Sequence, residues 1–389
     1  MNWPTASLGD LCQLDRRGLR SEEPDTRQLP FVGVENVESG SGVINLNNGS
    51  RVGSQKSTSF QFDERHVLYA KLRPYLNKVA IPAFVGNCST ELVPLLPRAG
   101  VDREFLGYLL RRKETVEYVM SSVTGARMPR TDMKALMSLS VPFPPLDEQR
   151  RIVGILNRAA NIERLRKQAQ ERLRELIPAL FIKMFGDPAD NPMGWEMRPL
   201  GEFCILTQYG TNKKATDQAD GLPVLRMSNV TYRGELDCRD LKWARLSNND
   251  TEKHLLRKGD ILFNRTNSKE LVGKTGIWDG RFDAVAASYF IRLRVDETSI
   301  CPTYVWAFMN SAATKQRLFE TARGAIGQAN INAEEVKSLP LPVPPLDLQR
   351  TYSKLAEKTQ SELQFTEPNS RNISDLQKSL MSRLLDDVA

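Results

Sequence analysis

One proline-led motif occurs twice in the sequence, and the second copy lies 200 residues after the first. It reads Pro-Pro-Leu-Asp-Glu-Gln-Arg at 144–150 and Pro-Pro-Leu-Asp-Leu-Gln-Arg at 344–350. Consecutive prolines favour extended backbone, and a proline suits the first position of a helix because its missing N–H would be unpaired there. Each copy therefore predicts the start of a helix at its prolines, Pro145 and Pro345. The same offset persists downstream and pairs Leu176, Leu180 and Asp187 with Leu376, Leu380 and Asp387.

Further matches lie upstream of the prolines, at an offset of 192 residues. The repeat unit therefore includes the segment before each helix, and the chain is two copies of one module. Each module contains short apolar runs typical of strands, and then a helix that we expect to begin at Asp102 or Pro302. The upstream matches pair Trp3, Leu8, Cys12 and Leu14 with Trp195, Leu200, Cys204 and Leu206.

After the first motif, apolar residues recur at steps of three or four, which is typical of a coiled-coil seam. Pro178 predicts a kink or a local break in this helix, and we expect its C-terminal counterpart to be interrupted near Pro368. Two helices with one apolar seam each most simply pack on each other. The expected seam consists of Ile152, Leu156, Ala159, Ile162, Leu165, Ala169, Leu173, Leu176 and Leu180.

The sequence therefore predicts an α+β chain of four segments. Two tandem globular domains, at 1–145 and 188–345, alternate with two helical regions, at 146–187 and 346–389. Antiparallel packing of the two long helices as a coiled coil would relate the two modules by an approximate two-fold axis.

Composition narrows the class of protein. A net charge of +7 and an isoelectric point of about 9.1 suit a polyanionic partner without establishing one. The five cysteines contain no C-x-x-C pair, which favours reduced thiols and a cytoplasmic protein. Because no apolar stretch approaches 18 residues, we expect neither secretion nor a membrane span.

The motifs of catalytic proteins are missing from the sequence. A phosphate-binding loop ending at Lys274-Thr275 would need a glycine at position 268, which is Ser268. Neither a G-x-G-x-x-G fingerprint nor the Asn-Pro-Pro-aromatic tetrapeptide of adenine methyltransferases is present. His66 and His254 have no His or Cys at metal-ligand spacing, so we expect surface or internally satisfied histidines. The prediction is a binding protein with no catalytic residues, no metal site and no directly bound cofactor.

Basic and hydrogen-bonding residues gather at corresponding places in both modules. Such side chains neutralise phosphates or make bidentate contacts with base edges. For any single residue a solvated loop is an equal alternative, but recurrence in both copies favours binding. The candidates are Lys71, Arg73, Lys78, Arg127 and Arg130 in the first module, and Lys213, Lys214, Arg265, Asn267, Lys269, Arg323, Gln328 and Asn330 in the second.

Over essentially its whole length, the chain resembles the DNA-specificity subunits of type I restriction-modification systems. The resemblance is carried by both Pro-Pro-Leu-Asp-x-Gln-Arg motifs, by the stretch at 68–78 and by Met-Phe-Gly-Asp-Pro at 184–188. It implies two target-recognition domains, each reading one half of a bipartite, asymmetric DNA site. The helices would set the unread spacer and dock two methyltransferase subunits.

The resemblance further implies a non-catalytic subunit whose partners carry the activity. The partners would be double-stranded DNA, two methyltransferase subunits that bind S-adenosylmethionine and methylate adenine, and motor and nuclease subunits. Leu348 departs from the first copy, which has Glu148, and could weaken the second helix start. The candidate helix-start and subunit-interface residues are Pro145, Leu146, Gln149, Arg150, Pro345, Leu346, Gln349 and Arg350.

Two other classes of protein remain open. One is a self-sufficient methyltransferase or nuclease with degenerate motifs, which turnover by the isolated chain would reveal. The other is a coiled-coil scaffold that binds proteins, and its binding would lack the steep salt dependence of phosphate contacts.

Overall fold

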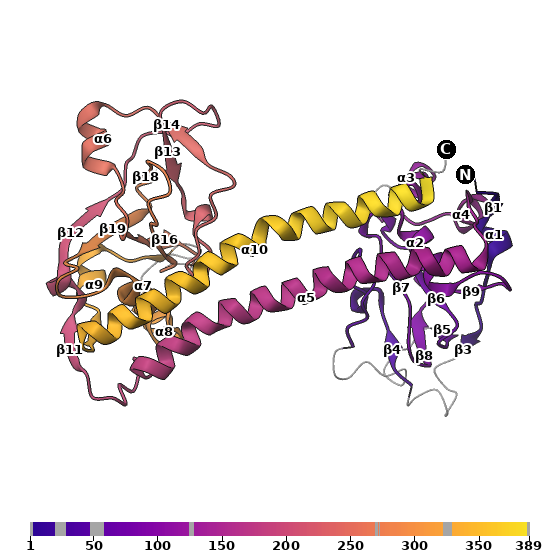
Figure 1. Cartoon of the computed structure of the whole chain (residues 1–389), viewed down its shortest axis with the longest axis horizontal. Helices are drawn as coiled ribbons and strands as arrows, with labels where there is room; N and C mark the ends of the chain where they lie inside the picture. The colour runs from indigo at the N-terminus through magenta and orange to yellow at the C-terminus, as the bar shows by residue number, and fades with distance from the viewer. Residues whose placement is uncertain are drawn as a thin grey trace. The chain divides into compact units, whose positions relative to one another are not determined.

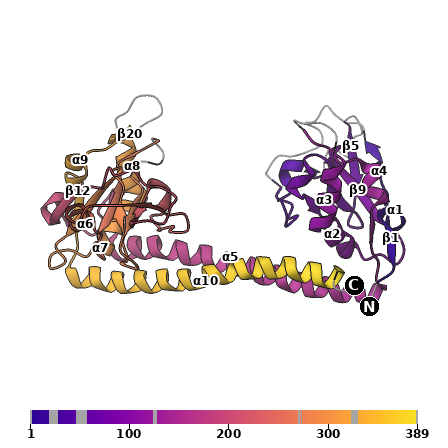
Figure 2. The same ribbon diagram turned by 90° about the horizontal axis from the view of Figure 1, so that it is seen from above.

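The computed structural model describes residues 3–19, 29–46, 58–123, 128–268, 271, 273–321 and 329–386. The chain forms two compact units, drawn in Figures 1 and 2, and each is described by itself. The first consists of Met1–Arg166 with Asn369–Ala389, and the second of Lys167–Pro368. This division falls inside the helical regions that the sequence places at 146–187 and 346–389.

The first unit contains two four-stranded sheets, ordered β2-β9-β6-β7 and β3-β5-β8-β4. The β4–β8 pair is parallel, and the other pairs of these two sheets are antiparallel. Its elements are β1 (Thr5–Ser7), α1 (Leu8–Leu11), β2 (Cys12–Leu14), β3 (Gly18–Leu19), β4 (Phe31–Val32), β5 (Ser59–Phe62), β6 (Val67–Ala70), β7 (Val79–Ala80), β8 (Gly86–Ser89), β9 (Leu92–Pro97), α2 (Arg103–Arg111), α3 (Lys113–Ser121), α4 (Met133–Ser138), β10 (Ser140–Pro142) and the start of α5 (Leu146–Phe185).

The second unit contains a four-stranded sheet ordered β12-β19-β15-β17 and a three-stranded sheet ordered β14-β13-β18. Its elements are β11 (Glu196–Pro199), β12 (Cys204–Tyr209), β13 (Leu222–Leu225), β14 (Lys242–Ala244), α6 (Asn248–His254), β15 (Ile261–Asn264), β16 (Thr266–Asn267), β17 (Thr275–Ile277), β18 (Val285–Ala286), β19 (Phe290–Val295), α7 (Pro302–Asn310), α8 (Ala312–Thr321), β20 (Ala329–Asn330), α9 (Ala333–Lys337), β21 (Pro340–Val343) and the start of α10 (Leu346–Asp386).

The two units share one topology. The order β2-β9-β6-β7 matches β12-β19-β15-β17, and the parallel pair β4–β8 matches the parallel pair β13–β18. A two-stranded antiparallel pair precedes each long helix, β1–β10 in one unit and β11–β21 in the other. The predicted α+β class and the duplication are confirmed.

Each module contains a pair of successive helices between its sheets and its proline motif, α2 and α3 in the first module and α7 and α8 in the second. The Asp102 carboxylate accepts hydrogen bonds from the first turn of α2, and Pro302 is the first residue of α7, as the sequence predicts. The expected single helix after Asp102 is wrong in extent, because α2 ends at Arg111 and α3 begins at Lys113. Arg112 between them has extended backbone, with ψ of 144°, which ends one hydrogen-bond ladder and starts another.

The long helices pack on each other in antiparallel fashion within each unit. In the second unit, the Tyr352 hydroxyl of α10 donates to the Ile177 carbonyl of α5 at 3.3 Å. The rings of Phe181 and Phe185 lie 5.9 and 5.4 Å from the Tyr352 ring, between centroids. In the first unit, Leu380 near the end of α10 packs against the cluster that contains Ile152 near the start of α5. The end of each helix therefore lies beside the start of the other.

The breaks expected at two prolines are wrong. Helix α5 is uninterrupted through Pro178, and α10 is uninterrupted through Pro368. A proline inside a helix costs about 3 kcal/mol. Burial of Ile177, Phe181 and Phe185 contributes about 1.5–3 kcal/mol for each side chain. That gain outweighs the cost of Pro178. Beyond Pro368, Leu380 and Leu384 of α10 pack against the core of the first unit.

The expected apolar seam of α5 is buried near its start, and its last residue, Leu180, packs partly buried against the core of the second unit, but the row between them is largely exposed. Ile152 and Leu156 are buried, whereas Ile162, Leu165 and Leu176 are 47%, 50% and 42% exposed. An α-helix drifts by about 20° per heptad from a strict seven-residue repeat. Over the length of α5 the buried row therefore shifts by nearly one position, and Ile177 replaces Leu176 as the buried residue.

A buried ionisable residue directly precedes β15 in the second unit and the corresponding strand, β6, in the first unit. In the second unit it is Asp260, which is fully buried, with its carboxylate oxygens 2.8 Å from Arg292 Nε and 2.7 Å from Arg294 Nε. Burial lowers the pKa of the Arg292 guanidinium, and the Asp260 charge opposes that change.

The first unit has a histidine beside two carboxylates at this place. His66 is fully buried, and its ring nitrogens lie 2.9 Å from an Asp63 oxygen and 3.1 Å from an Asp15 oxygen. Hydrogen bonding to Arg65 holds the pKa of the Asp63 carboxyl well below its usual range. The expectation of an internally satisfied histidine is confirmed for His66.

A polar pair in one core is replaced by an apolar pair in the other. The hydroxyls of Tyr69 and Thr131 are 3.0 Å apart and buried. The corresponding residues of the second unit, Phe263 and Ile331, are fully buried. Both members of the pair therefore differ together, and neither unit keeps an unpaired hydroxyl at this position.

The substitution Tyr69→Phe is expected to destabilise the first unit by about 1–2 kcal/mol, because the Thr131 hydroxyl loses its buried partner. Adding Thr131→Val is expected to recover most of that loss. Chemical denaturation followed by circular dichroism measures both variants, with Tyr75→Phe at an exposed position as the control. Additive losses in the double variant would contradict the coupling of the two hydroxyls.

Candidate nucleic-acid interface

A short two-stranded ribbon extends from the central strand β15 of the second unit. Strand β16 pairs with β20, which brings Asn267 and Asn330 onto one ribbon. The Ile331 N–H donates to the Arg265 carbonyl at 3.0 Å, and the Arg265 N–H donates to the Tyr289 carbonyl at 3.0 Å. The backbone of Arg265 is therefore held on both sides at the base of the ribbon.

The first unit brings the corresponding segments together through an isolated bridge instead of a strand pair. Leu72, just after β6, bridges Arg130, and the Thr131 N–H donates to the Lys71 carbonyl at 2.8 Å. Arg73 has left-handed backbone, with φ of 51°, and its side chain is exposed. The ribbon brings together three candidate residues, Lys71, Arg73 and Arg130.

The charges of the first ribbon are partly neutralised by one carboxylate. Glu91 lies 4.0 Å from the Lys71 ammonium and 3.4 Å from the Arg130 guanidinium. Exposed pairs of this kind contribute about 0–1 kcal/mol, so a ligand can replace them. Among the described residues, the structure records no ion pair for Arg73.

In the second ribbon, Arg265 lies beside an aromatic ring, whereas the corresponding Lys71 of the first ribbon lies beside a carboxylate. The Arg265 guanidinium carbon lies 4.7 Å from the centre of the Tyr209 ring. The Tyr209 hydroxyl accepts a hydrogen bond of 3.4 Å from the Ala333 N–H. Tyr289 occupies the position that corresponds to Glu91, and its side chain is exposed. Within the described part of the chain, no carboxylate pairs with Arg265.

Lys78 has an internal contact away from the ribbon. Its ammonium donates to the Val34 carbonyl at 2.9 Å, and Lys274 of the second unit donates to the Met227 carbonyl at 2.7 Å. Each of these carbonyls lies in the short 3₁₀ turn that follows β4 or β13. Lys78 therefore fixes a turn in the free chain, and its assignment to DNA stays a prediction.

The remaining candidates lie elsewhere. Lys213 and Lys214 are exposed on the connection between β12 and β13, and Lys213 lies 3.7 Å from Asp250. Four candidates, Arg127, Lys269, Arg323 and Gln328, fall outside the described residues. The two ribbons thus contain six of the predicted residues, three in each unit. These are Lys71, Arg73 and Arg130 in the first unit, and Arg265, Asn267 and Asn330 in the second.

The helix starts each contain a fully buried glutamine. The Gln149 side chain donates to the Pro144 carbonyl at 2.8 Å and to the Gly100 carbonyl at 3.1 Å, and accepts from the Asp102 N–H at 2.8 Å. These three bonds fasten the first turn of α5 to the loop before α2.

Gln349 repeats the arrangement in the second unit. Its side chain donates to the Pro344 carbonyl at 2.8 Å and accepts from the Cys301 N–H at 2.9 Å. Both glutamines therefore join each helix to its own module and present no surface to a partner.

The first helical residues are Leu146 and Leu346, directly after Pro145 and Pro345, where the predicted helical regions begin. The Pro145 carbonyl accepts from the Gln149 N–H at 3.0 Å, which makes this proline the capping residue. Leu348, which replaces Glu148, packs partly buried against the core of the second unit.

The exposed residues of the two helix starts match position by position. Pro145 and Pro345 are exposed, as are Arg150 and Arg350. Arg150 lies 3.8 Å from Asp147, and Arg350 lies 3.6 Å from Asp347. The chain therefore presents one small surface twice.

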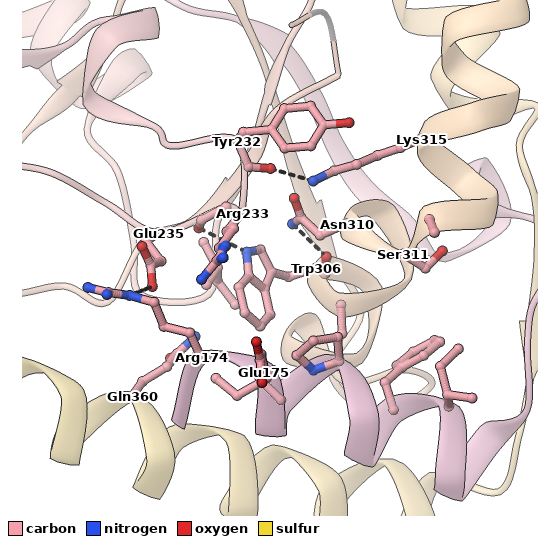
Figure 3. A pocket seen from close by; sticks show the side chains of 18 of the residues that line it. Arg174, Glu175, Tyr232, Arg233, Glu235, Trp306, Asn310, Ser311, Lys315 and Gln360 are labelled. Carbon is pink, nitrogen blue, oxygen red and sulfur yellow. Dashed lines mark hydrogen bonds and ion pairs between the residues drawn. The ribbon is translucent and has the colours of Figure 1, made fainter. Parts of the chain in front are cut away.

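The second unit also has a cleft of about 940 Å³ beside α5, shown in Figure 3. Trp306 and Phe181 contribute apolar surface, and Lys315 donates to the Tyr232 carbonyl at one side. None of its lining residues comes from β16 or β20, so it is separate from the ribbon. The sequence does not indicate this cleft, because five distant segments build it.

In the part of the chain that the structure describes, no group of three or more His, Cys, Asp and Glu residues could hold a metal ion. No helix in the same residues is long and apolar enough to cross a membrane.

Comparison with known families gives a match that covers both modules. The family described as Type I restriction modification DNA specificity domain matches residues 1–175 and 192–369. The chain belongs to this family. The two matched segments correspond to the two copies of the module, so the type I specificity fold occurs twice in tandem.

Curated relatives in this family include two from Escherichia coli. The type I restriction enzyme EcoKI specificity subunit of strain K12 is 23% identical over 279 residues, which are 68% of this chain and 60% of the relative. The EcoDI specificity subunit is 29% identical over 133 residues, which are 33% of this chain and 30% of the relative. The chain thus spans less than two thirds of the length of either relative.

Solved structures of the type I restriction-modification system share the fold. An S subunit from M. genitalium matches with a TM-score of 0.64 and 15% identity, over 99% of this chain and 96% of that chain. A chain from a study of complex assembly and conformational transition in the type I R-M system matches with a TM-score of 0.59 and 19% identity, over 98% and 97%. These likenesses support two tandem recognition folds.

Proposed function

We propose that this chain is the non-catalytic, sequence-specific DNA-binding subunit of a type I restriction-modification complex. One observation carries the proposal: two units of the same fold hold the same ribbon, and the side chains on the two ribbons differ. Identical modules would suit a palindromic site. Two modules with different side chains at the same place suit an asymmetric site in two halves.

The chemistry of the ribbons suits double-stranded DNA. The major groove admits a two-stranded β-ribbon, and arginine and asparagine are the side chains that pair with guanine and adenine edges. The ribbon of the second unit carries Arg265, Asn267 and Asn330. The exposed Lys213 and Lys214, on a separate loop, suit phosphate contacts that position the unit.

The partner subunits are proposed from the repeated helix starts. A surface that occurs twice in one chain, around Arg150 and around Arg350, suits two copies of one partner. We assign it to two methyltransferase subunits, which would supply S-adenosylmethionine and adenine methylation in the cytoplasm. Helices α5 and α10 would set the unread spacer, and motor and nuclease subunits would join the same complex.

Methylation mapping with an exchanged module tests this proposal. The chain is expressed with its methyltransferase partner, and methylated adenines are located by single-molecule sequencing. Replacing residues 1–145 by the corresponding domain of another specificity subunit is expected to change one half of the methylated motif and to leave the other half intact. The chain alone, given S-adenosylmethionine and the same DNA, is expected to transfer no methyl groups.

The reciprocal exchange of residues 188–345 is the matched control and is expected to change the other half only. A change of both halves by one exchange would be inconsistent with independent reading units. Methyl transfer by the isolated chain would favour an enzyme instead.

A further inference from the structure

We propose that Arg265 reads a guanine in the half-site of the second unit, and that Tyr209 holds its guanidinium in the reading position. This inference rests on the proposed function and names the base and the residue pair. The contacts of Arg265 differ from those of Lys71, the corresponding residue in the first unit.

Arg265 is held in place before any ligand binds. Its N–H and its carbonyl both make backbone hydrogen bonds of 3.0 Å, to Tyr289 and Ile331. Its guanidinium lies over the Tyr209 ring at 4.7 Å, and the ring is itself anchored through the Ala333 N–H. A side chain ordered in advance loses less freedom on binding, which favours geometric recognition.

The donors of Arg265 are not consumed within the described residues. Its Nε is buried and makes no hydrogen bond there, and the structure records no carboxylate beside the guanidinium. An arginine presents a planar fork of donors that matches the O6 and N7 acceptors of guanine. Adenine, thymine and cytosine do not offer that pair of acceptors in the major groove.

The neighbouring side chains fit a base edge. Asn267 of β16 lies two residues beyond Arg265, which joins β15 to β16. Two residues of extended backbone span about 6.6 Å, close to the length of two base-pair steps. The exposed Tyr289 adds an uncharged ring where the first unit has Glu91. Among the described residues, the surroundings of Arg265 are therefore basic and polar without a competing carboxylate.

The first unit has a different arrangement at the matching position. Lys71 takes the place of Arg265, and its ammonium lies 4.0 Å from Glu91. A lysine is a point charge without a fork, and here a carboxylate stands beside it. The corresponding position of the first half-site is accordingly not expected to require guanine through Lys71.

A base contact fits Arg265 better than a phosphate contact. A phosphate accepts a flexible cation from many directions, which is the chemistry of the exposed Lys213 and Lys214. Arg265 instead lies over the Tyr209 ring and is fixed at its backbone. That rigidity selects one direction of approach, which is what discrimination between base edges needs.

The substitution Arg265→Lys tests the inference in the complete complex with its methyltransferase partner. Lysine keeps the charge and removes the fork. Methylation mapping on plasmid DNA with randomised sites is expected to show that one base pair of one half-site loses its preference for guanine by roughly 10- to 100-fold. The other half-site is expected to be unchanged. Tyr209→Leu is expected to relax the same base pair by a smaller factor.

Arg198→Lys is the matched control, because Arg198 also stacks on a ring, Phe203 at 4.9 Å, but is paired with Glu202. It is expected to leave the motif unchanged. Intrinsic fluorescence verifies folding, since Trp195, Trp243, Trp278 and Trp306 all lie in the second unit.

Two outcomes would overturn the assignment of Arg265. One is weaker binding to all sequences alike, with the slope of log affinity against log salt reduced by about 1, which identifies a phosphate contact. The other is an unchanged motif in both Arg265→Lys and Tyr209→Leu. A wild-type complex that methylates no bipartite motif would instead reject the proposed function itself.

Discussion

Replacing Asp260 with alanine is expected to destabilise the second unit by about 3–5 kcal/mol, because it leaves the buried Arg292 and the partly buried Arg294 without their counter-charge. Arg292 is 6% exposed, and Arg294 makes two hydrogen bonds to the same carboxylate, at 2.7 and 2.9 Å. The carboxylate also accepts from the Arg257 N–H at 2.7 Å, so the turn before β15 loses a bond as well.

Tryptophan fluorescence measures this loss, because four of the five tryptophans lie in the second unit. Denaturant unfolding gives the change in free energy from the shifted midpoint. The control is Asp217→Ala. The Asp217 side chain is 82% exposed, and the change removes its ion pair with Lys242. That change is expected to cost less than about 1 kcal/mol. Equal midpoints for the two variants would show that Asp260 contributes no more than a surface pair.

The sequence was sufficient to predict the repeat and the class of fold. The matched prolines and the offset of 200 residues indicate two modules, and the sheets confirm them. Asp260 and His66 could not be recognised as equivalent, because they are different residue types although they occupy the same place. Only the structure relates them, since different polar side chains can satisfy a buried site when their partners change too.

Candidate binding residues of the ribbons could be predicted from the sequence, but the pairing of the strands that carry them could not. Strands β16 and β20 have two residues each, and Thr266 pairs with Asn330 across a long stretch of sequence. Two residues carry no periodicity, so no pattern distinguishes such strands from loops. The sequence therefore indicates basic and amide side chains in each segment, and the fold determines which of them meet.

The long helices show a different limit of the sequence. Their periodicity predicts an apolar face, but Leu176 is exposed and Ile177 is buried. Which of two adjacent residues faces the core depends on the accumulated rotation of the helix and on the module against which it packs. The helices continue through Pro178 and Pro368 for a similar reason. The local free-energy cost of a proline is balanced by tertiary contacts, which the sequence does not display.

Replacing Gln349 with alanine is expected to destabilise the second unit by about 2–4 kcal/mol, because the Cys301 N–H and the Pro344 carbonyl lose their buried partner. Gln149→Ala is expected to cost the first unit at least as much, since Gln149 makes three such bonds. In each case the loss falls on the joint between a module and its long helix.

Asp217→Ala is again the control for Gln349→Ala, because it removes only an exposed ion pair with Lys242. It is expected to cost less than about 1 kcal/mol. Fluorescence-detected unfolding compares the two, and methylation mapping reports whether the second half-site is still read when the joint is weakened. Equally small losses for both variants would mean that the packing of Leu346 and Leu348 against the core holds the helix start without the glutamine.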